Sequence, residues 1–509
     1  MRLLATWTAM LVGALAYSQY FNQRYDAFSW GLAQGGWDIE RSPEGYAVIS
    51  VSSDADSISP DSSFYHYSVL LTRLDGSGVK IGEARSFRPW HGTTSGWANC
   101  SDTIPDGGHV IGGATESLPP AVYEVYLMRL NSLGDTLWTR VFGGPGQYWI
   151  GRQVKRTADG GFLIVGDTDA SGYVDGFALK TDSSGNEQWR ETYGYSPVLL
   201  DGFVAVDLGP EATYYCSGTS EATAFNGDHY VARIDSAGDL IWEVRWGGPF
   251  SEGATQVTTL SDGQPLICTG NSYGSGGASM RPCLAKLDSS DGSFIWEHEY
   301  GALTFSTTLF AAKERPNGDL IACGVSYASG DQQGLLLRTT SEGDSIWMRT
   351  YYYQDTLITT GQGRFYDVLP TPDGGFIAAG GAYNPAGAPY PPGYSQDTWV
   401  VKVDSMGCIV PGCDGVGVSE IVTNLIGSVS VFPNPAHGQV QVQVDLPRTL
   451  SNMADLKLTL VNAAGQVALA QAAQVGSNTV ELGALSAGVY YMHLSSNTTW
   501  LSGTKLMIE

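Results

Sequence analysis

Two turn signals recur along this chain at a nearly regular spacing, and they restrict its fold more than any other feature. The first is an Asp-Gly or Asn-Gly pair followed by a short apolar run, as at Asp159-Gly160 before residues 162–165. The second follows a basic residue and ends in glycine, as at residues 181–185. Each signal has seven copies, some of them weak, at intervals of about 51 to 64 residues. Because Asp-Gly between β-rich runs favours a tight hairpin, each interval is expected to fold as hairpins.

A tryptophan follows the glycine of most second turns by four residues, and an aromatic residue follows each tryptophan by another four. The tryptophans are Trp138, Trp189, Trp242, Trp296 and Trp347. A further short strand before each Asp-Gly gives four strands per interval. A four-stranded sheet repeated at this period is typical of a β-propeller blade. The sequence therefore predicts an all-β fold with a seven-bladed β-propeller over residues 19–413.

The last repeat lacks this outer strand. Pro411 occupies the tryptophan position, and proline cannot donate a ladder hydrogen bond. Phe21 and Tyr25 show the missing aromatic spacing near the N-terminus. We therefore expect residues 20–29 to supply the fourth strand of the seventh blade, which hides a sheet edge that would otherwise template aggregation.

The spacing from turn to tryptophan, Asp-x-x-Gly-x-x-x-Trp, resembles the tryptophan-docking motif of quinoprotein propellers. In that family the tryptophan packs between blades. The resemblance therefore implies a structural task for these residues and does not imply a quinone cofactor.

The two ends of the chain differ from the repeats. Residues 1–18 carry one basic residue, an apolar run and a small-residue end, which is the pattern of a secretory signal peptide. Residues 414–427 are a predicted linker, and the alternating strands of residues 428–509 predict a small β-sandwich. Outside the signal peptide no stretch reaches about 18 uninterrupted apolar residues, so no transmembrane segment is predicted.

Three motifs in the tail carry a family resemblance. Residues 431–435 read Val-Phe-Pro-Asn-Pro, residues 488–491 read Gly-Val-Tyr-Tyr, and residues 505–509 read Lys-Leu-Met-Ile-Glu. Together they resemble the type A C-terminal sorting domain of type IX secretion substrates from Bacteroidetes-type bacteria, over roughly residues 418–509. The resemblance implies an Ig-like sandwich, the type IX secretion machinery as a partner, and a secreted or outer cell-surface location. An ordinary Ig-like accessory domain is the alternative.

Composition excludes several classes of function. The formal net charge is −24 and the pI is near 4.5, which argues against nucleic-acid binding because phosphates require a basic surface. Apolar residues make up 43% of the chain, too many for an intrinsically disordered protein. The seven histidines are scattered and form no recognisable catalytic motif.

Export permits disulfides, and two pairs of cysteines are candidates. Cys408 and Cys413 bracket a tight turn at the end of the repeats. Cys268 and Cys283 lie on neighbouring predicted strands and are either paired across the hairpin or free. The remaining cysteines are expected to be buried thiols that pack as small apolar residues.

One acidic loop resembles a calcium-binding loop in its spacing. Asp167, Asp169 and Asp175 provide oxygens at positions 1, 3 and 9, and Gly172 stands at position 6. Ala178 occupies position 12, where a bidentate glutamate is required, so the loop is incomplete. Ca²⁺ is the one cofactor that the sequence suggests, and a solvated hairpin loop is the alternative.

Aromatic loops provide a candidate binding surface at one mouth of the propeller, formed by Tyr65, Tyr67, Tyr390 and Tyr394. A rigid linker explains the proline-rich segment around the last two equally well. We favour an exported propeller that binds glycans or proteins without catalysis. The alternatives are an exported polysaccharide-degrading enzyme whose carboxylates converge at the central channel, and a surface-layer or adhesion component; the fold alone does not choose among them.

Overall fold

The structure is a computed structural model that describes residues 20–509 with the exception of several segments. These are residues 26–33, 54–66, 88–93, 96–98, 117–122, 145, 195–199, 224–225, 274–278, 302–305, 328–330, 354–361, 384–395, 411, 413–427, 447–454, 464, 484 and 497–498. The predicted signal peptide and linker lie outside the described residues.

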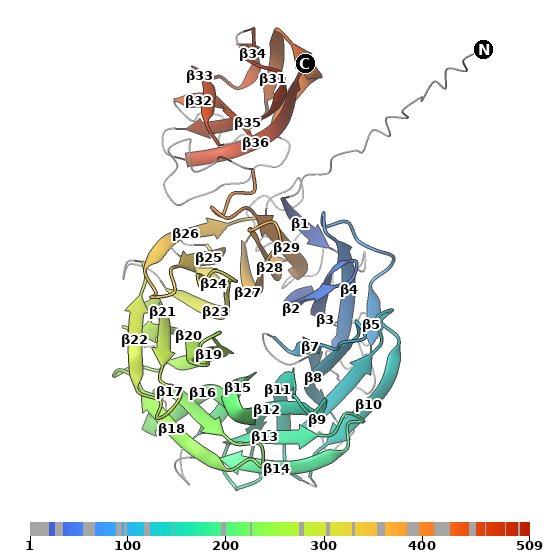
Figure 1. The fold of residues 1–509 in the computed structure, drawn as a ribbon, viewed down its shortest axis with the longest axis vertical. Helices are drawn as coiled ribbons and strands as arrows, with labels where there is room; N and C mark the ends of the chain where they lie inside the picture. Colours follow the sequence, from blue (N-terminus) through green and yellow to red (C-terminus); the bar gives the residue numbers. More distant parts are fainter. Residues whose placement is uncertain are drawn as a thin grey trace, which may run out of the picture.

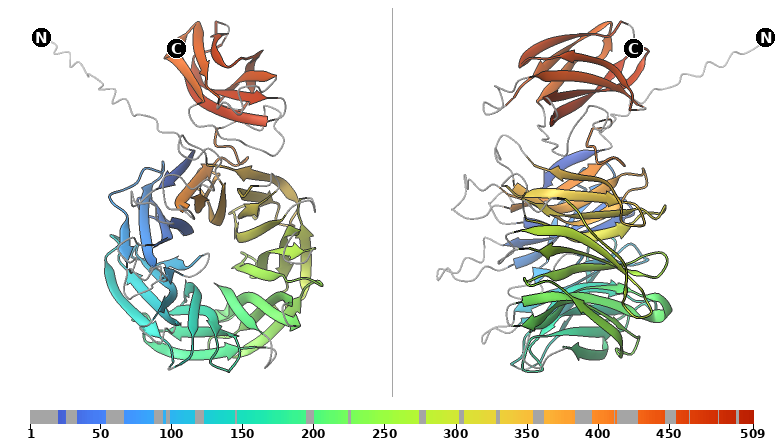
Figure 2. Two further views of the ribbon diagram at one scale, coloured as in Figure 1. Left: turned by 180° about the vertical axis from the view of Figure 1, so that it is seen from behind. Right: turned by 90° about the vertical axis from the view of Figure 1, so that its left-hand side faces the viewer.

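Seven antiparallel sheets form a ring around a central channel, as the repeats predict (Figures 1 and 2). The inner strands are β2 (Gln34–Ser42), β7 (Ser101–Thr103), β11 (Trp149–Arg156), β15 (Asp201–Leu208), β19 (Gly253–Thr259), β23 (Thr307–Glu314) and β27 (Gln362–Pro370). The second strands are β3 (Gly45–Ser53), β8 (His109–Glu116), β12 (Phe162–Thr168), β16 (Tyr214–Thr223), β20 (Pro265–Ser272), β24 (Leu320–Ser326) and β28 (Phe376–Tyr383). The third strands are β4 (Tyr67–Asp75), β9 (Tyr123–Leu130), β13 (Asp175–Thr181), β17 (Asn226–Ile234), β21 (Met280–Leu287), β25 (Gln333–Thr339) and β29 (Gln396–Val403). The outer strands are β5 (Arg85–Phe87), β10 (Thr136–Phe142), β14 (Glu187–Tyr193), β18 (Leu240–Trp246), β22 (Phe294–Glu299), β26 (Ser345–Tyr351) and β1 (Phe21–Tyr25).

The second blade departs from this plan at its inner edge. Its sheet has five strands, because β6 (Thr94–Ser95) and β7 both pair with β8. The strand β7 is only three residues long.

The N-terminal strand closes the ring, which confirms the expectation from the sequence. β1 pairs antiparallel with β29, so that Phe21 lies opposite Lys402 and Tyr25 lies opposite Thr398. The seventh blade therefore combines the two ends of the propeller in one sheet, and no separate contact is needed to hold the ring shut.

An aromatic latch joins most blades to the next, and at the junction of the first and second blades the turn glycine Gly134 lies against Leu71 and Arg85 instead. The ring of Trp189 lies against the turn glycine Gly238 of the following blade, and its Nε1 donates to the carbonyl oxygen of Ser236 at 2.9 Å. Tyr193 Oη on the same strand donates to the carbonyl oxygen of Gly238 at 2.6 Å. These turn glycines have positive φ and lie in contact with the rings. Both the backbone conformation and the lack of space therefore exclude a side chain at each of them.

The closing strand repeats this latch across the gap between the chain ends. The ring of Phe21 lies against Gly78, the turn glycine of the first blade, and Tyr25 Oη donates to the carbonyl oxygen of Gly78 at 2.5 Å. The tryptophan series is therefore structural, as its resemblance to a docking motif implies.

A second set of glycines accommodates a bulge in the inner strands. In six blades one inner-strand residue is unpaired, for example Arg152 between Gly151 and Gln153. A Cβ on Gly166 would clash with the backbone carbonyl oxygen of Ile150, where the bulge approaches the second strand. The same clash recurs in three further blades at Gly218, Gly324 and Gly380. This close approach explains why the apolar runs of the second strands end in glycine.

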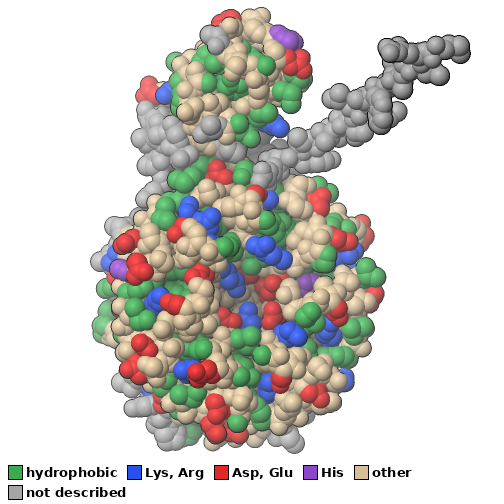
Figure 3. All heavy atoms as spheres, viewed as in Figure 1, with side chains coloured by type: hydrophobic (Ala, Val, Ile, Leu, Met, Phe, Trp, Pro, Cys, Tyr) green, Lys and Arg blue, Asp and Glu red, His purple; other side chains and the backbone are tan. Residues whose placement is uncertain are grey.

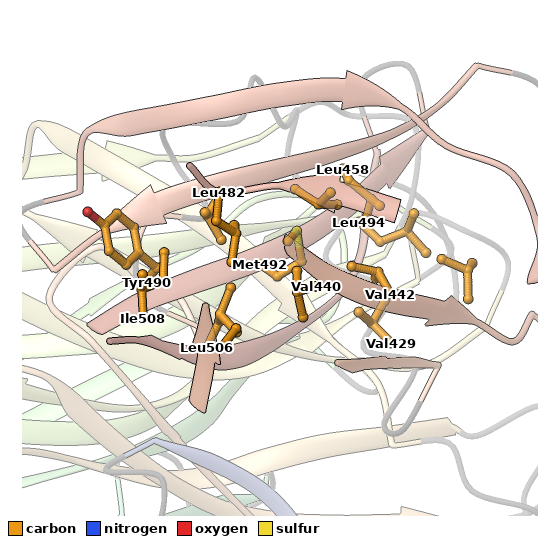
Figure 4. Packing of buried hydrophobic residues seen from close by; sticks show 14 of the residues in the cluster. Val429, Val440, Val442, Leu458, Leu482, Tyr490, Met492, Leu494, Leu506 and Ile508 are labelled. Atoms are coloured by element: carbon orange, nitrogen blue, oxygen red, sulfur yellow. The ribbon is translucent and has the colours of Figure 1, made fainter. Parts of the chain in front are cut away.

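The C-terminal unit is a small β-sandwich with its own core (Figure 4). Its strands are β30 (Val429–His437), β31 (Gln439–Val444), β32 (Leu456–Asn462), β33 (Val467–Ala472), β34 (Gly476–Glu481), β35 (Gly488–Ser496) and β36 (Thr499–Ile508). They follow the order β33-β32-β35-β36-β30-β31-β34, in which β30 pairs with β36 through Ala436 and with β31 along its first half. Alternate residues such as Val440 and Val442 point inward from this curved sheet.

The sandwich contacts the propeller where the repeats end. Trp500 is fully buried in a small cluster with Cys408, and Met406 and Val410 pack against it. Its Nε1 donates to Nδ1 of the buried His493 at 2.9 Å.

We predict that deleting residues 20–29 lowers the melting temperature sharply, because the deletion removes the outer strand of the seventh blade and its latch to the first. The measurement is thermal unfolding of this protein beside a control that begins at Tyr20. Equal melting temperatures would show that the closing strand does not hold the ring.

We predict that Gly166→Ala destabilises the propeller by about 1–3 kcal/mol, the usual cost of overpacking, or more if the bulge is lost. Gly76→Ala is the matched control, because a Cβ on Gly76 meets no atom within 4 Å. Urea unfolding midpoints compare the two. If Gly166→Ala lost no more stability than Gly76→Ala, the bulge explanation would be contradicted.

Candidate functional site in the central channel

Polar side chains occupy two successive positions, here called levels, along the inner strands that line the centre of the ring. The first level contains Asp38, Gln153, Gln256 and Asp367, which directly follow the bulged residues. The second level lies two residues further along each strand and contains Glu40, Asp102, Lys155, Asp207 and Lys313. Acidic and basic side chains surround the hollow at the centre of the face in Figure 3.

The first level joins neighbouring blades. The side-chain oxygens of Gln153 and Gln256 accept hydrogen bonds from backbone N–H groups of the next blade, at 2.6 and 2.9 Å. Asp38 accepts in the same way from Ser101 N at 2.7 Å, and Asp367 accepts from Ile39 N at 3.2 Å. These four side chains satisfy inner-strand donors that have no strand partner on the channel side.

Two side chains of the second level also accept hydrogen bonds from the backbone of the next blade. Asp102 accepts from Arg156 N, and Asp207 accepts from Thr259 N, both at 2.7 Å. Glu40 differs, because the corresponding N–H of Thr103 donates to Asp102 instead, at 2.8 Å. No hydrogen bond links the side chain of Glu40 to another described residue. It is a partly exposed carboxylate that the assembly of the blades does not use.

The charges at the second level strongly perturb one another. Burial raises the pKa of Glu40 to about 8, with Asp102 and Asp367 adding to the shift and Lys155 and Lys313 opposing it. Burial also holds the pKa of Asp38 well above its usual range, with Glu40 and Asp367 adding to the effect. At neutral pH Glu40 is therefore largely protonated and able to donate a hydrogen bond or a proton.

Lys155 remains charged in this environment. Burial lowers its pKa, but the surrounding carboxylates of Asp102, Asp207, Glu40 and Asp38 outweigh burial and raise the pKa above its usual range. Lys155 thus provides a positive charge among acidic side chains from the first, second and fourth blades.

Four buried polar atoms on or beside these levels have no hydrogen-bond partner among the described residues. They are Oδ1 of Asp38, Oδ1 of Asp367, Nδ2 of Asn99 and Nε2 of Gln153, and each of the four side chains is at most 2% exposed. A buried polar group without a partner costs about 1–3 kcal/mol. The centre of the ring therefore holds two acceptors and two donors whose hydrogen-bonding capacity the described residues do not use.

An arc of aromatic rings lies beside the carboxylates of the first and seventh blades. Trp37 stacks on Tyr366 with ring centroids 4.6 Å apart, and Phe310 packs against Tyr366 at 5.4 Å. All three are bulged residues, from the first, seventh and sixth blades. Trp37 directly precedes Asp38 and Tyr366 directly precedes Asp367, whereas Phe310 precedes Ala311. Trp37 is partly exposed, and Tyr366 and Phe310 are buried behind it.

A comparison with known proteins identifies the C-terminal unit. Residues 430–509 match a family described as the secretion system C-terminal sorting domain. This chain ends in a sorting domain. The protein is therefore exported, to a secreted or cell-surface location, and the sorting domain engages the type IX secretion machinery. No helix among the described residues is long and apolar enough to cross a membrane.

The solved structures that resemble the chain do so at low similarity. Sqt1 from Chaetomium thermophilum is 11% identical, with a TM-score of 0.41 over 75% of this chain and 100% of its own. The β-propeller domain of the Trilobed protease from Pyrococcus furiosus is 10% identical, with a TM-score of 0.38 over 73% of this chain and 94% of its own. YCF48 from Cyanidioschyzon merolae is 12% identical, with a TM-score of 0.39 over 74% of this chain and 97% of its own. No curated protein matches the sequence.

The motifs that indicate the sorting domain lie in contact. Asn434, from the Phe-Pro-Asn-Pro segment, donates through Nδ2 to the carbonyl oxygen of Lys505 at 2.8 Å. Its Oδ1 accepts from Met507 N at 2.9 Å. One asparagine thus joins the first strand of the sorting domain to the last.

Each of the three predicted calcium ligands accepts a hydrogen bond from a group of the protein itself. Asp167 accepts from Arg152 Nε and Nη2 at 2.9 and 2.7 Å, and Asp169 accepts from Tyr148 N at 2.8 Å. Asp175 accepts instead from the hydroxyl of Ser171. Across the described residues, no group of three or more His, Cys, Asp or Glu side chains is placed to hold a metal ion. The hairpin-loop interpretation fits these contacts.

The second disulfide prediction is wrong. Cys268 lies opposite Leu284 and Cys283 lies opposite Thr269, so the two thiols point to opposite faces of the sheet. Both are buried and free, as are Cys100, Cys216 and Cys323. Cys408 is buried and disulfide-bonded. Its predicted partner, Cys413, lies outside the described residues, and this pairing stays a prediction.

The predicted aromatic binding surface is not described. Tyr65, Tyr390 and Tyr394 lie outside the described residues, and of Tyr67 only its place in β4 is given. The channel residues replace them as the candidate site. Sequence reasoning placed carboxylates at the channel only within the enzyme alternative and named none of them.

Stability is predicted to fall as pH rises from about 5 to 9, because Glu40 binds its proton more tightly in the folded protein than in the unfolded chain. Glu40→Gln removes this difference in proton binding. Over that pH range the melting temperature of the variant should therefore fall by roughly 2–5 °C less than that of the parent. Glu83→Gln, at a side chain 91% exposed, is the control. Identical pH profiles for Glu40→Gln and the parent would contradict the raised pKa.

Proposed function

We propose that this exported protein is a glycan-binding propeller whose ligand enters the central channel. The observation that supports this most is the aromatic arc of Phe310, Tyr366 and Trp37 beside the unpartnered oxygen of Asp38. Sugar rings present apolar C–H faces that pack on aromatic rings, and hydroxyl groups that bond to carboxylates and amides. A surface with a few converging polar groups is the usual form of a small-ligand site.

The balance of polar groups also favours a neutral, hydroxyl-rich ligand. The unpartnered atoms include both an acceptor, on Asp38, and donors, on Asn99 and Gln153. A hydroxyl group can satisfy either kind, whereas a simple anion or cation satisfies only one. The net charge of −24 further disfavours polyanionic ligands.

Polysaccharide cleavage in the same channel is a second candidate, and Glu40 favours it. Glu40 has a pKa near neutrality and takes no part in joining the blades, which are properties of a general acid. The carboxylates of Asp102 and Asp207 act on Lys155 from neighbouring blades and provide possible bases. Release of new reducing ends by the parent protein but not by Glu40→Gln would favour cleavage over binding alone.

We predict that Trp37→Ala weakens glycan binding at least tenfold, equivalent to about 1.4 kcal/mol, while Trp37→Phe loses less because it keeps an aromatic face. A glycan array identifies binders, and calorimetry measures their affinity. Tyr173→Ala is the matched control, since Tyr173 is 46% exposed and belongs to no channel strand. Equal affinities for the parent, Trp37→Ala and the control would contradict binding at the aromatic arc.

A further inference from the structure

The sorting domain packs on the last turn of the propeller, residues 404–408, which follows β29. The sandwich lies over the edge of the ring at which β1 and β29 meet (Figures 1 and 2). Trp500 of β36 is fully buried there against Cys408, with Met406 and Val410 packed beside it. These residues form a cluster separate from the core of the sandwich. Trp500 therefore fills the contact with the propeller and not the core of the sorting domain.

Two glycines bring the propeller and the sandwich close together. A Cβ on Gly503 of β36 would lie 3.1 Å from Cγ1 of Val410. A Cβ on Gly412 would lie 2.8 Å from Cγ1 of Val461, near the end of β32. The last described residues of the propeller thus touch two strands of the sandwich. Together with Trp500, these close contacts define one orientation of the sorting domain on the ring.

The seventh blade differs from the others at this turn. In the second to sixth blades the three residues that follow the turn glycine are all exposed, as in the Asn-Glu-Gln run of residues 186–188. In the seventh blade they are Cys408, Ile409 and Val410. Cys408 is 0% exposed, Ile409 is 7% exposed, and Val410 is half-buried. Apolar residues at positions that face water elsewhere in the ring indicate a turn that is built to be covered.

The sixth blade holds the same turn in place. Trp347 Nε1 donates to the carbonyl oxygen of Ser405 at 3.1 Å. Tyr351 Oη donates to the carbonyl oxygen of Gly407 at 2.8 Å. The turn that receives the latch of the sixth blade therefore also receives Trp500.

The start of the propeller contributes to the contact as well. Tyr20 directly precedes β1, and burial raises its pKa to about 12, with Asp373, Asp404 and Tyr491 adding to the shift. Tyr20 thus lies near the turns of the seventh blade and near β35 of the sandwich. The first and last residues of the propeller come together only when β1 pairs with β29. An open ring therefore offers only part of this surface.

We propose that the sorting domain docks on the seam of the propeller, where β1 pairs with β29, and takes its fixed position only once the ring has closed. A closed propeller then presents the export signal in one orientation, whereas an open propeller is joined to it only through the chain. Docking is independent of glycan binding, because the contact uses no residue of the two channel levels or of the aromatic arc.

Engineered cysteines test the docked position in the full chain. Val410→Cys with Gly503→Cys places two thiols within reach of a disulfide. Val410→Cys with Phe432→Cys is the matched control, because Phe432 is 63% exposed on the sandwich. Peptide mass mapping follows both crosslinks under a mild oxidant. We expect the first pair to react at least about tenfold faster, since docking adds to the effective concentration that the tether alone provides. Equal rates would show a sorting domain that is tethered but not docked, and would overturn the proposal.

Trp500→Ala, added to the first cysteine pair, tests the contact itself. We expect the crosslink to slow toward the rate of the control pair while circular dichroism shows both units still folded. Val467→Ala is the matched control, because Val467 is a sandwich residue that is 50% exposed. An unchanged crosslinking rate in Trp500→Ala would overturn the role of Trp500 in docking.

A variant of the closing latch tests the dependence on closure. A Cβ on Gly78 would lie 2.5 Å from the ring of Phe21, so Gly78→Ala disrupts the latch between the seventh and first blades. Gly318→Ala is the matched control, because its φ of 87° is close to the 83° of Gly78 but its Cβ meets no atom nearer than 3.7 Å. We expect the crosslink of the first cysteine pair to slow in Gly78→Ala and to keep its rate in Gly318→Ala.

A milder variant keeps this test decisive if Gly78→Ala does not fold. Tyr25→Phe loses only the hydrogen bond to the carbonyl oxygen of Gly78, and we expect a smaller slowing of the crosslink in the same direction. Thermal unfolding shows whether each variant has weakened the latch. An unchanged crosslinking rate in a folded variant with a lowered melting temperature would overturn the dependence on closure and leave docking intact.

Discussion

The docking of an aromatic residue onto the turn glycine of the next blade is the contact on which the ring depends. It recurs at every blade junction except that of the first and second blades, where Gly134 lies against Leu71 and Arg85. Each such contact is made to another blade, so these blades do not complete their packing alone. At the junction between the chain ends Phe21 and Tyr25 make the same contacts with Gly78 that Trp189 and Tyr193 make with Gly238. The contact that closes the ring is therefore one further copy of the contact that joins neighbouring blades elsewhere.

The sequence revealed the propeller because its determinants are local and periodic. Turn chemistry is set by a few adjacent residues, as at Asp182, whose Oδ1 accepts from the backbone N–H groups of Ser184 and Asn186. Pairing across strands is not local in this way. Cys268 and Cys283 occupy adjacent strands, but a register offset of one residue places their thiols on opposite faces, and spacing alone does not reveal that offset.

The channel site was harder to predict, because its residues are distant in sequence and meet only when the ring closes. A signal was nevertheless present. Glu40, Asp102, Lys155 and Lys313 each stand five residues before the glycine of the first turn signal, and Asp38, Gln153, Gln256 and Asp367 stand seven before it. Aligning the repeats on these glycines would have collected both levels. The bulge that leaves Trp37 and Tyr366 unpaired, and so lets their rings stack, has no comparable signature in the sequence.

The first polar level contains both amides and carboxylates, and the two kinds of side chain make the same hydrogen bond between blades. Gln153 and Gln256 join blades through a neutral amide oxygen, in the same way as the carboxylates of Asp38 and Asp367. A buried carboxylate is costly where an amide suffices, and the raised pKa of Asp38 reflects that cost. Both carboxylates lie in the blades that carry Trp37 and Tyr366, whereas the amides lie elsewhere in the ring. Joining the blades therefore does not explain why these two positions are acidic, and the proposed ligand site beside them offers a reason, since proteins retain such costs at functional sites.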